Sequence, residues 1–314
     1  MDKETLLKNY GDSPIAYLTL ETDLQYFEDK KGFIAHVNKS VIGDPIINQK
    51  YINPLLKEFS IRYPKHCFYH INERTAEQLS KLGYFTSFMG YEHQIDLNQI
   101  VINWTAFPSL KSGANKCLNQ GIKIIEQKID ELDHNILADI ETKWLQSKKI
   151  KTSVRFMIRQ LDFKKRKDFR YFFAYHEKKV IAYYFFSPLY KNNKLIGYYT
   201  DNARYLPKFK KNLSDLFLSH CITQFKSEGH QTLSLGLNPF AEAKTSPFKQ
   251  HTLIPLLFKL IYQFDFPGYG YQGIHRYTQK FHGIKTPYFF ASKKKFPIIN
   301  LVNTWKYMCF NTKD

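Results

Sequence analysis

Two short stretches combine carboxylate, guanidinium and amide side chains in a way that could support group transfer. Asp201-Asn202-Ala203-Arg204 follows a predicted strand, at the kind of strand end where α/β folds gather functional groups. Asp201 and Arg204 could pair with each other while the Arg204 fork stays available to a phosphate. The alternative is a structural salt bridge at the entry to a helix.

The second stretch, residues 234–242 (SLGLNPFAE), leaves the next predicted strand. Gly236 permits close backbone approach and Pro239 fixes the direction in which the chain leaves. Asn238 and Glu242 would then be presented beside the strand end. An ordinary transition from strand to loop explains the same pattern.

Three further segments carry basic and aromatic side chains. Residues 269–281 (YGYQGIHRYTQKF) include Arg276, Tyr277 and Lys280, which suit base stacking and phosphate contact, although an edge hairpin with a solvated basic face is the alternative. Residues 155–170 include Arg155 and Arg159 and predict a track for an RNA backbone. Residues 293–295 are lysines before a predicted amphipathic helix, which favours either contact with a membrane surface or docking on the core.

Several common kinds of site are not indicated. The chain has no GxSxG, HExxH, Walker lysine loop or GxGxxG motif. Its four cysteines are scattered, so we expect neither a metal site nor a disulfide framework. No apolar run reaches the length of a membrane span and no leader is recognisable, so we expect a cytoplasmic protein, with possible peripheral contact at the inner membrane surface.

The predicted elements alternate between strands and helices, as layered α/β units do. In the first part, strands are expected at residues 15–20, 24–27, 32–37, 66–71 and 92–97, and helices at 48–63 and 73–82. Residues 108–150 are expected to be helical. In the second part, strands are expected at 170–176, 180–187, 194–200 and 231–236, and helices at 212–227 and 252–263.

This order of antiparallel strands, helix, strand and helix is that of the acetyltransferase-like fold. We therefore predict an α/β protein of two tandem acetyltransferase-like (GNAT) halves, residues 1–129 and 130–314, with the chemistry in the second. A chain of 314 residues is long enough for two domains of about 150 residues each.

The positive charge is confined to one half of the chain. Residues 1–150 contain 18 Lys and Arg against 19 Asp and Glu, whereas residues 151–314 contain 28 against 9. An excess of positive charge in one half of the chain favours a polyanionic partner, either RNA or an anionic membrane surface. A lysine-rich solvated face without a partner is the alternative.

The same segments resemble a known family in order and spacing. GYYTDNAR, LSLGLNPFAEA and GIHRYTQKF, with Tyr288 a few residues later, are similar to the catalytic domain of the phosphatidylglycerol lysyltransferases, the synthase part of the multiple peptide resistance factors. Residues 41–45, 83–92, 95–97 and 144–145 extend the resemblance into the first half.

The resemblance implies specific residue roles. Asp201 and Arg204 match the family's Asp-x-x-Arg pair, Glu242 its acidic residue after the glycine strand, and Lys280 the second lysine of its FKxKF-type element. Thr278 stands where the family has the first of those lysines, and the tryptophan that follows is missing.

The implied reaction moves an aminoacyl group from aminoacyl-tRNA to a lipid hydroxyl, without a metal or redox cofactor. Asp201 or Glu242 would hold the α-ammonium group of the donor or assist deprotonation, and Arg204 and Lys280 would grip phosphate. The expected substrate-binding residues are Asn238, Arg276, Tyr277, Tyr288, Arg155 and Arg159. The expected partners are aminoacyl-tRNA and an anionic lipid or membrane surface.

Two other functions fit parts of the pattern. An N-acyltransferase that uses acyl-CoA would share the fold, but the segment after Arg204 lacks the glycines of a pyrophosphate loop. A non-catalytic module that binds RNA or membrane would explain the charge and leave Asp201, Arg204 and Glu242 without a purpose.

Overall fold

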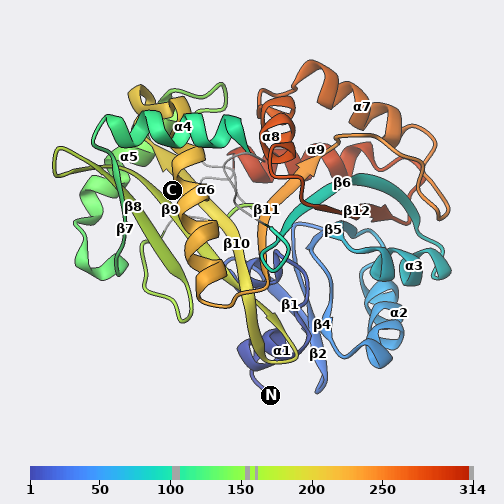
Figure 1. Cartoon of the computed structure of the whole chain (residues 1–314). Coiled ribbons are helices and arrows are strands. Elements are labelled where there is room, and N and C mark those ends of the chain that lie inside the picture. Colours follow the sequence, from blue (N-terminus) through green and yellow to red (C-terminus); the bar gives the residue numbers. More distant parts are fainter. Residues whose placement is uncertain (101–106, 153–155, 160–161, 311–314) are drawn as a thin grey trace.

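The computed structural model describes residues 1–100, 107–152, 156–159 and 162–310. Its centre is one strongly twisted, mixed sheet with the strand order β1-β2-β3-β5-β12-β6-β11-β10-β9-β8-β7, and β4 pairs with β2 at one side. Helices cover both faces of the sheet (Figure 1). The mixed α/β class predicted from the sequence is confirmed.

The first half of the sheet is built mainly from the N-terminal part of the chain. Its strands are β1 (Gln25–Glu28), β2 (Gly32–Val37), β3 (Ser40–Ile42), β4 (Ile46–Ile47), β5 (Cys67–Ile71) and β6 (Phe85–Asp96), and its helices are α1 (Lys3–Tyr10), α2 (Ile52–Arg62) and α3 (Glu73–Lys81). Asp2 and Asn72 cap α1 and α3, since each side chain accepts a hydrogen bond from a backbone N–H of the first turn.

The second half repeats this plan. Its helices are α4 (Pro108–Asn119), α5 (His134–Gln146), α6 (Lys210–Ser227), α7 (Ile254–Phe264), α8 (Tyr271–Gln279) and α9 (Ile298–Phe310). Its strands are β7 (Lys123–Glu126), β8 (Arg170–His176), β9 (Lys179–Lys191), β10 (Lys194–Tyr205), β11 (Thr232–Pro239) and β12 (Ile284–Ser292).

Both halves show the order expected for an acetyltransferase-like fold. In the first, antiparallel strands lead to β3, helix α2 follows, and β5 lies parallel to β3. In the second, β7 to β10 are antiparallel, helix α6 follows, and β11 lies parallel to β10. The fold class of two tandem acetyltransferase-like halves is therefore confirmed.

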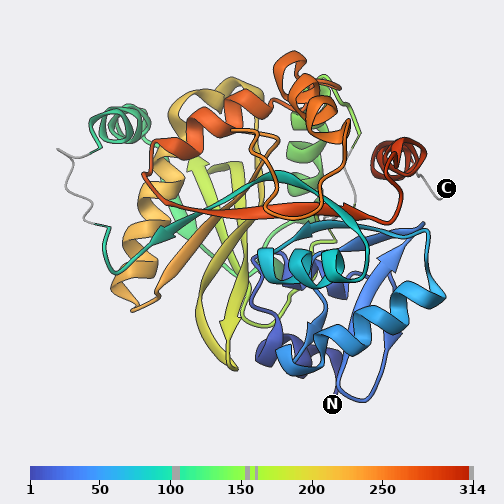
Figure 2. The ribbon, with the colours of Figure 1, turned by 90° about the vertical axis from the view of Figure 1, so that its right-hand side faces the viewer.

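The two halves exchange their final strands. β12, from the end of the chain, lies between β5 and β6, and β6 lies beside β11. In Figure 2 β12 runs as one long strand across the middle of the molecule. β7, from before residue 130, pairs with β8 of the second half. The division at residues 129 and 130 stays a prediction about folding units.

Three clusters of buried apolar side chains hold the layers together. One lies beneath α2 and α3 and includes Leu56, Phe59 and Phe68, and a second lies beneath α4 and α6. The third is shared between the halves, because it joins Phe33 of β2 and Phe290 of β12 to Tyr183 of β9. The seam between the halves is thus a packed core and positions groups from both halves rigidly.

Some local predictions are wrong. Residues 15–20 were expected to form a strand, but Ala16–Leu20 is a 3₁₀ helix, because a run of apolar residues buried on all sides satisfies either structure. The helical stretch expected over residues 108–150 is interrupted by β7, whose Ile124 and Ile125 are β-branched. Residues 271–279 form helix α8, so the edge hairpin considered for this segment is wrong.

Candidate active site

A cavity of about 510 Å³ lies at the seam between the two halves. Its walls are mainly apolar and come from β10, β11, α7 and α9, with Tyr69, His70 and Met89 contributed by the first half. The polar groups of the lining are His70 near the end of β5 and Tyr199, Thr200 and Asp201 in the middle of β10. An apolar cavity with a few ionisable groups in its wall is suited to an amphipathic ligand.

The first polar group is a cluster formed by His70, Glu92 and Ser234. Glu92 on β6 is completely buried, and its Oε2 atom lies 3.2 Å from Nε2 of His70. The Ser234 hydroxyl donates a hydrogen bond to Oε1 of the same carboxylate. Glu92 therefore anchors one side chain from each half of the sheet.

His70 has an unusual backbone for a residue in a strand. Its φ is +56°, in the left-handed region, and it lies where β5 carries one residue more than β12 opposite it. A bulge of this kind redirects a side chain, and such strained positions cluster at functional sites. Here the bulge directs His70 to the cavity wall.

The second polar group is a cluster formed by Asp201, Arg159 and Glu21. Asp201 falls at an irregularity of β10, and its Oδ2 atom accepts a 2.6 Å hydrogen bond from Nε of Arg159. Arg159 also pairs with Glu21, and its side chain is only 5% exposed. Burial alone would lower the pKa of Arg159, but Asp201 and Glu21 raise it above its ordinary value. Arg159 is thus a fixed cation behind the cavity.

Tyr199 connects the two clusters electrostatically. It lines the cavity, and burial followed by the charges of Glu92 and Asp201 raises its pKa well above the ordinary value. The phenol therefore stays protonated and can donate a hydrogen bond into the cavity.

Arg204 does not pair with Asp201, contrary to expectation. Its guanidinium lies over the ring of Trp144 on α5, and its Nε atom lies 3.7 Å from a carboxylate oxygen of Glu141. Lys148 lies near the same group, and burial together with the charges of Lys210 and Arg204 lowers its pKa to about 8. Of these three cations, Arg204 lies near the end of β10 and Lys210 lies at the start of α6.

Glu242 and Lys280 belong to two other groups of side chains. Glu242 pairs with Lys285 of β12 and with His275 of α8, and the hydrogen bond from Lys285 is the largest cause that lowers its pKa. Lys280 lies 3.4 Å from an oxygen of Asp215 on α6. Within the described part of the chain, Asp201, Arg204, Glu242 and Lys280 make no direct contact with one another, and only Asp201 lines the central cavity.

The remaining predicted binding residues are dispersed. Asn238 is buried on β11 and accepts a hydrogen bond from Thr278, and Tyr288 is buried with its ring edge-on to His70 at 4.5 Å. Tyr277 packs against Phe281 beside Lys280, and Arg276 is exposed on α8. Arg155 lies outside the described residues. Their roles as substrate contacts stay predictions.

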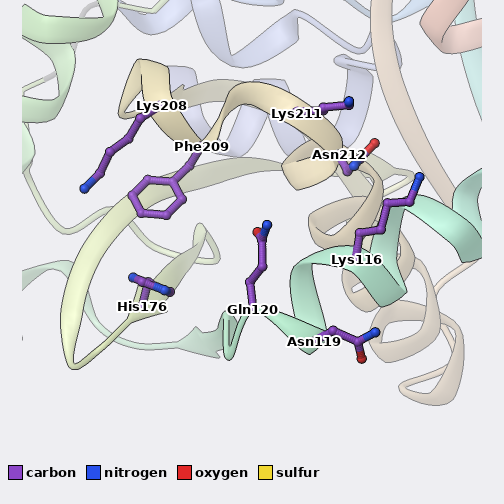
Figure 3. Close-up of a pocket in the computed structure, with 8 residues that line it drawn as sticks. All are labelled: Lys116, Asn119, Gln120, His176, Lys208, Phe209, Lys211 and Asn212. Atoms are coloured by element: carbon purple, nitrogen blue, oxygen red, sulfur yellow. The ribbon is translucent and has the colours of Figure 1, made fainter.

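A second hollow, of about 700 Å³, is basic (Figure 3). Lys208 and Phe209 lie between β10 and α6, Lys211 and Asn212 lie at the start of α6, and Lys116 of α4 and Gln120 at its C-terminal end face them. Asn212 has a φ of +65°, and regular helix begins only after it. Within the described residues none of the three lysines forms an ion pair, so their charge is available to an anion.

Large exposed apolar side chains lie on or beside α7 and α9, two helices that also line the central cavity. Phe266, Ile298 and Val302 line the cavity and are also exposed. Phe264 of α7 is 71% exposed and Ile299 of α9 is 70% exposed, and Leu253, Leu256, Leu260 and Phe296 on or beside these helices are exposed as well. We call this set the apolar rim. Exposed apolar surface of this extent marks an interaction site.

Sequence reasoning missed the residues at the polar end of the cavity. His70, Glu92 and Tyr199 lie in ordinary-looking strands, and only the register of β5, β6 and β12 brings His70 to Glu92. The signal for this site that the sequence offered was polar residues within otherwise apolar strands. No helix within the described residues is long and apolar enough to cross a bilayer.

Comparison with solved structures shows the same fold in two proteins. The C-terminal domain of an Agrobacterium fabrum protein titled as a lysylphosphatidylglycerol synthetase has a TM-score of 0.82 at 15% identity, covering 99% of this chain and 97% of that one. L-PGS from Bacillus licheniformis has a TM-score of 0.78 at 19% identity, covering 96% and 94%. FemX is more distant, with a TM-score of 0.55 at 8% identity.

A search of curated proteins gave no match. A match to the family described as phosphatidylglycerol lysyltransferase, C-terminal, covers residues 4–292 and thus almost the whole sequence. The resemblance noted in the sequence is therefore confirmed, and this chain belongs to the phosphatidylglycerol lysyltransferase C-terminal family.

Proposed function

We propose that this protein transfers an aminoacyl group from aminoacyl-tRNA to a hydroxyl group of an anionic, phosphatidylglycerol-like lipid. The observation that carries the proposal is the central cavity, whose apolar walls run from the apolar rim to the His70 and Asp201 clusters. Membership of the family supports it.

The lipid would enter through the apolar rim. Each methylene group of an acyl chain that leaves water gains about 0.8 kcal/mol, so apolar walls favour the chain while the polar head meets the His70 and Asp201 clusters. Between residues 251 and 310 the chain has one acidic residue, Asp265, and eight basic ones, among them Lys259, Lys306 and residues 293–295. This balance suits an anionic bilayer surface.

The donor would bind through the basic side of the second half. The hollow with Lys116, Lys208 and Lys211 offers cations for phosphates, and Phe209 offers an aromatic face for a base. Arg204 and Lys148 carry the positive charge from this hollow along β10 toward Asp201. An RNA bound there would have a path for its aminoacylated end to the cavity.

The chemistry requires little beyond positioning. An aminoacyl ester is already activated, so the enzyme must orient the acceptor hydroxyl, remove its proton and stabilise a tetrahedral oxyanion. Asp201 could hold the α-ammonium group, since its ion pair with Arg159 keeps the carboxylate in place. Tyr199 could donate a hydrogen bond to the oxyanion.

The test is a transfer assay with the whole chain. Purified protein is incubated with a pool of radiolabelled aminoacyl-tRNAs and vesicles that contain phosphatidylglycerol, and the label in the organic phase is counted. We expect lipid-linked label that depends on both substrates. Label that appears only with acyl-CoA donors, or tight tRNA binding without any transfer, would contradict the proposal.

A further inference from the structure

We propose that His70 is the proton acceptor for the lipid hydroxyl and that Glu92 is its positioning residue. The proposal rests on the proposed function and adds to it a catalytic site in the first half of the chain, opposite the residues that the family resemblance singles out. Three observations carry it: the place of His70 in the cavity, the backbone that holds it there, and the buried carboxylate behind it.

His70 lies where an acceptor hydroxyl would come to rest. It lines the same cavity as Asp201, Thr200 and Gly236. A lipid whose chains fill the apolar part would bring its head group to this end. The ring is nearly inaccessible to bulk solvent, so a proton would pass between the ring and a bound ligand.

The backbone of His70 is held in an unfavourable conformation. A φ of +56° disfavours any residue with a β-carbon, and only the paired strands on each side keep it in place. The bulge between β5 and β12 covers this residue, which lines the cavity.

Glu92 fixes which ring nitrogen can act as the base. Its Oε2 atom lies 3.2 Å from Nε2, and a buried carboxylate accepts the Nε2–H hydrogen bond. Nδ1 then carries the free lone pair, and no partner for it is found in the parts of the chain that the structure describes. The Ser234 hydroxyl donates a hydrogen bond to the other carboxylate oxygen, which holds the Glu92 side chain in this orientation. The arrangement is that of a base held by a third group.

The titratable groups around His70 come from every packed strand. β6 contributes Glu92, β12 contributes Tyr288, whose ring centroid lies 4.5 Å from that of the imidazole, and β10 contributes Tyr199 and Asp201 at the cavity wall. The carboxylate of Glu92 lies within hydrogen-bond distance of the imidazole and orients it. Both tyrosines have a raised pKa because they are buried, so they do not compete as bases.

The step balances without any additional reactant. The lipid oxygen forms a bond to the aminoacyl carbonyl carbon while its proton passes to Nδ1 of His70. The tetrahedral intermediate then collapses, the bond between the carbonyl carbon and the ribose oxygen of the tRNA breaks, and His70 returns the proton to that oxygen. The products are aminoacylated lipid and free tRNA.

The experiment compares His70→Gln, His70→Gly and Glu92→Gln with wild type in the transfer assay. Glycine suits the left-handed backbone, so His70→Gly keeps the fold and leaves room for a small base. The control is His93→Gln, a buried neighbour of Glu92 that does not line the cavity. Vesicle binding, tRNA binding and melting temperature are measured for each.

We expect both His70 variants to lose about 100-fold or more in turnover, within the range for a general base, with lipid and tRNA binding changed less than about 2-fold. Added imidazole should restore part of the His70→Gly rate. The turnover of Glu92→Gln should lie between that of wild type and that of the His70 variants. Wild-type turnover in His70→Gln, or a loss matched by lost binding and not rescued by imidazole, would overturn the proposal. Inactive wild-type protein would instead refute the proposed function.

Discussion

The guanidinium carbon of Arg204 lies 4.1 Å from the ring centroid of Trp144, so this arginine is held by stacking on α5 and not by the carboxylate three residues before it. Glu141 fixes its Nε side at 3.7 Å. The planar group is therefore oriented before any substrate arrives, next to Lys148 and the start of α6.

Arg204→Lys should lower kcat/KM for aminoacyl-tRNA by about 10-fold or more, because a lysine can neither stack flat on Trp144 nor offer a fork to a phosphate. The fold should persist, since the charge is retained. Steady-state kinetics at fixed lipid concentration measure the effect. The matched control is Arg62→Lys, where another arginine lies over the rings of Phe27 and Tyr63 far from the cavity. Equal losses in both variants would refute a specific role.

Ile261→Trp should obstruct the cavity and raise the KM for lipid by about 10-fold, at a folding cost of about 1–3 kcal/mol for overpacking. Binding of tRNA should not change, because Ile261 belongs to α7 and not to the basic hollow. Titration with vesicles of increasing lipid content measures the KM. Ile136→Trp, on the exposed outer side of α5, serves as the control. A shift in tRNA affinity instead of lipid KM would contradict the assigned role of the cavity.

Phe264→Glu combined with Ile299→Glu should reduce binding to anionic vesicles at least about 10-fold. When α7 and α9 enter the membrane interface, each new negative charge must enter it as well. Co-sedimentation with phosphatidylglycerol vesicles at constant salt measures the binding. Ile61→Glu changes an equally exposed isoleucine on α2 and should have no effect. Unchanged vesicle binding in the double variant would remove the apolar rim as the membrane contact.

The variant with Lys116, Lys208 and Lys211 replaced by Gln should bind tRNA more weakly and with a shallower dependence on salt. If each lysine contacts one phosphate, the slope of log K against log salt should change by about 2–3. Filter binding over a series of salt concentrations gives the slope. The control variant replaces Lys30, Lys57 and Lys65 of the first half by Gln, which removes the same amount of charge from another part of the protein. A similar change in both variants would indicate a general charge effect and no defined site.

Asp44 should make the folded protein less stable as pH rises from about 4 to about 7. Burial raises the pKa of this carboxyl to about 7. Between the ordinary value and the raised one, the folded chain holds a proton that the unfolded chain releases, so the free energy of unfolding decreases with pH there. Asp44→Asn should flatten this part of the pH profile in urea unfolding. A profile identical to wild type would show that Asp44 is ionised in the fold.

The sequence predicted most of the elements but not the site they form. Strand 170–176 and the helices around residues 48–63 and 73–82 follow from periodicity, caps and turn residues, which are local signals. The cluster of His70, Glu92 and Ser234 depends on the pairing of strands far apart in the chain, and the bulge at His70 depends on its partner strand. Asp201 and Arg204 were identified from short sequence motifs. Their partners depend on a register irregularity in β10 and on the positions of Arg159 and Trp144.

The place of β12 between β5 and β6 has a consequence for how the protein is made. While the ribosome extends the chain, β5 emerges about 200 residues before the strand that belongs beside it, roughly 10–40 s at ordinary rates of synthesis. During that time its open edge can pair with any strand that it meets, including one of another nascent chain. Cells that produce this protein rapidly should therefore depend on chaperones to keep it from aggregating, and nonsense mutations before residue 284 should leave an insoluble product.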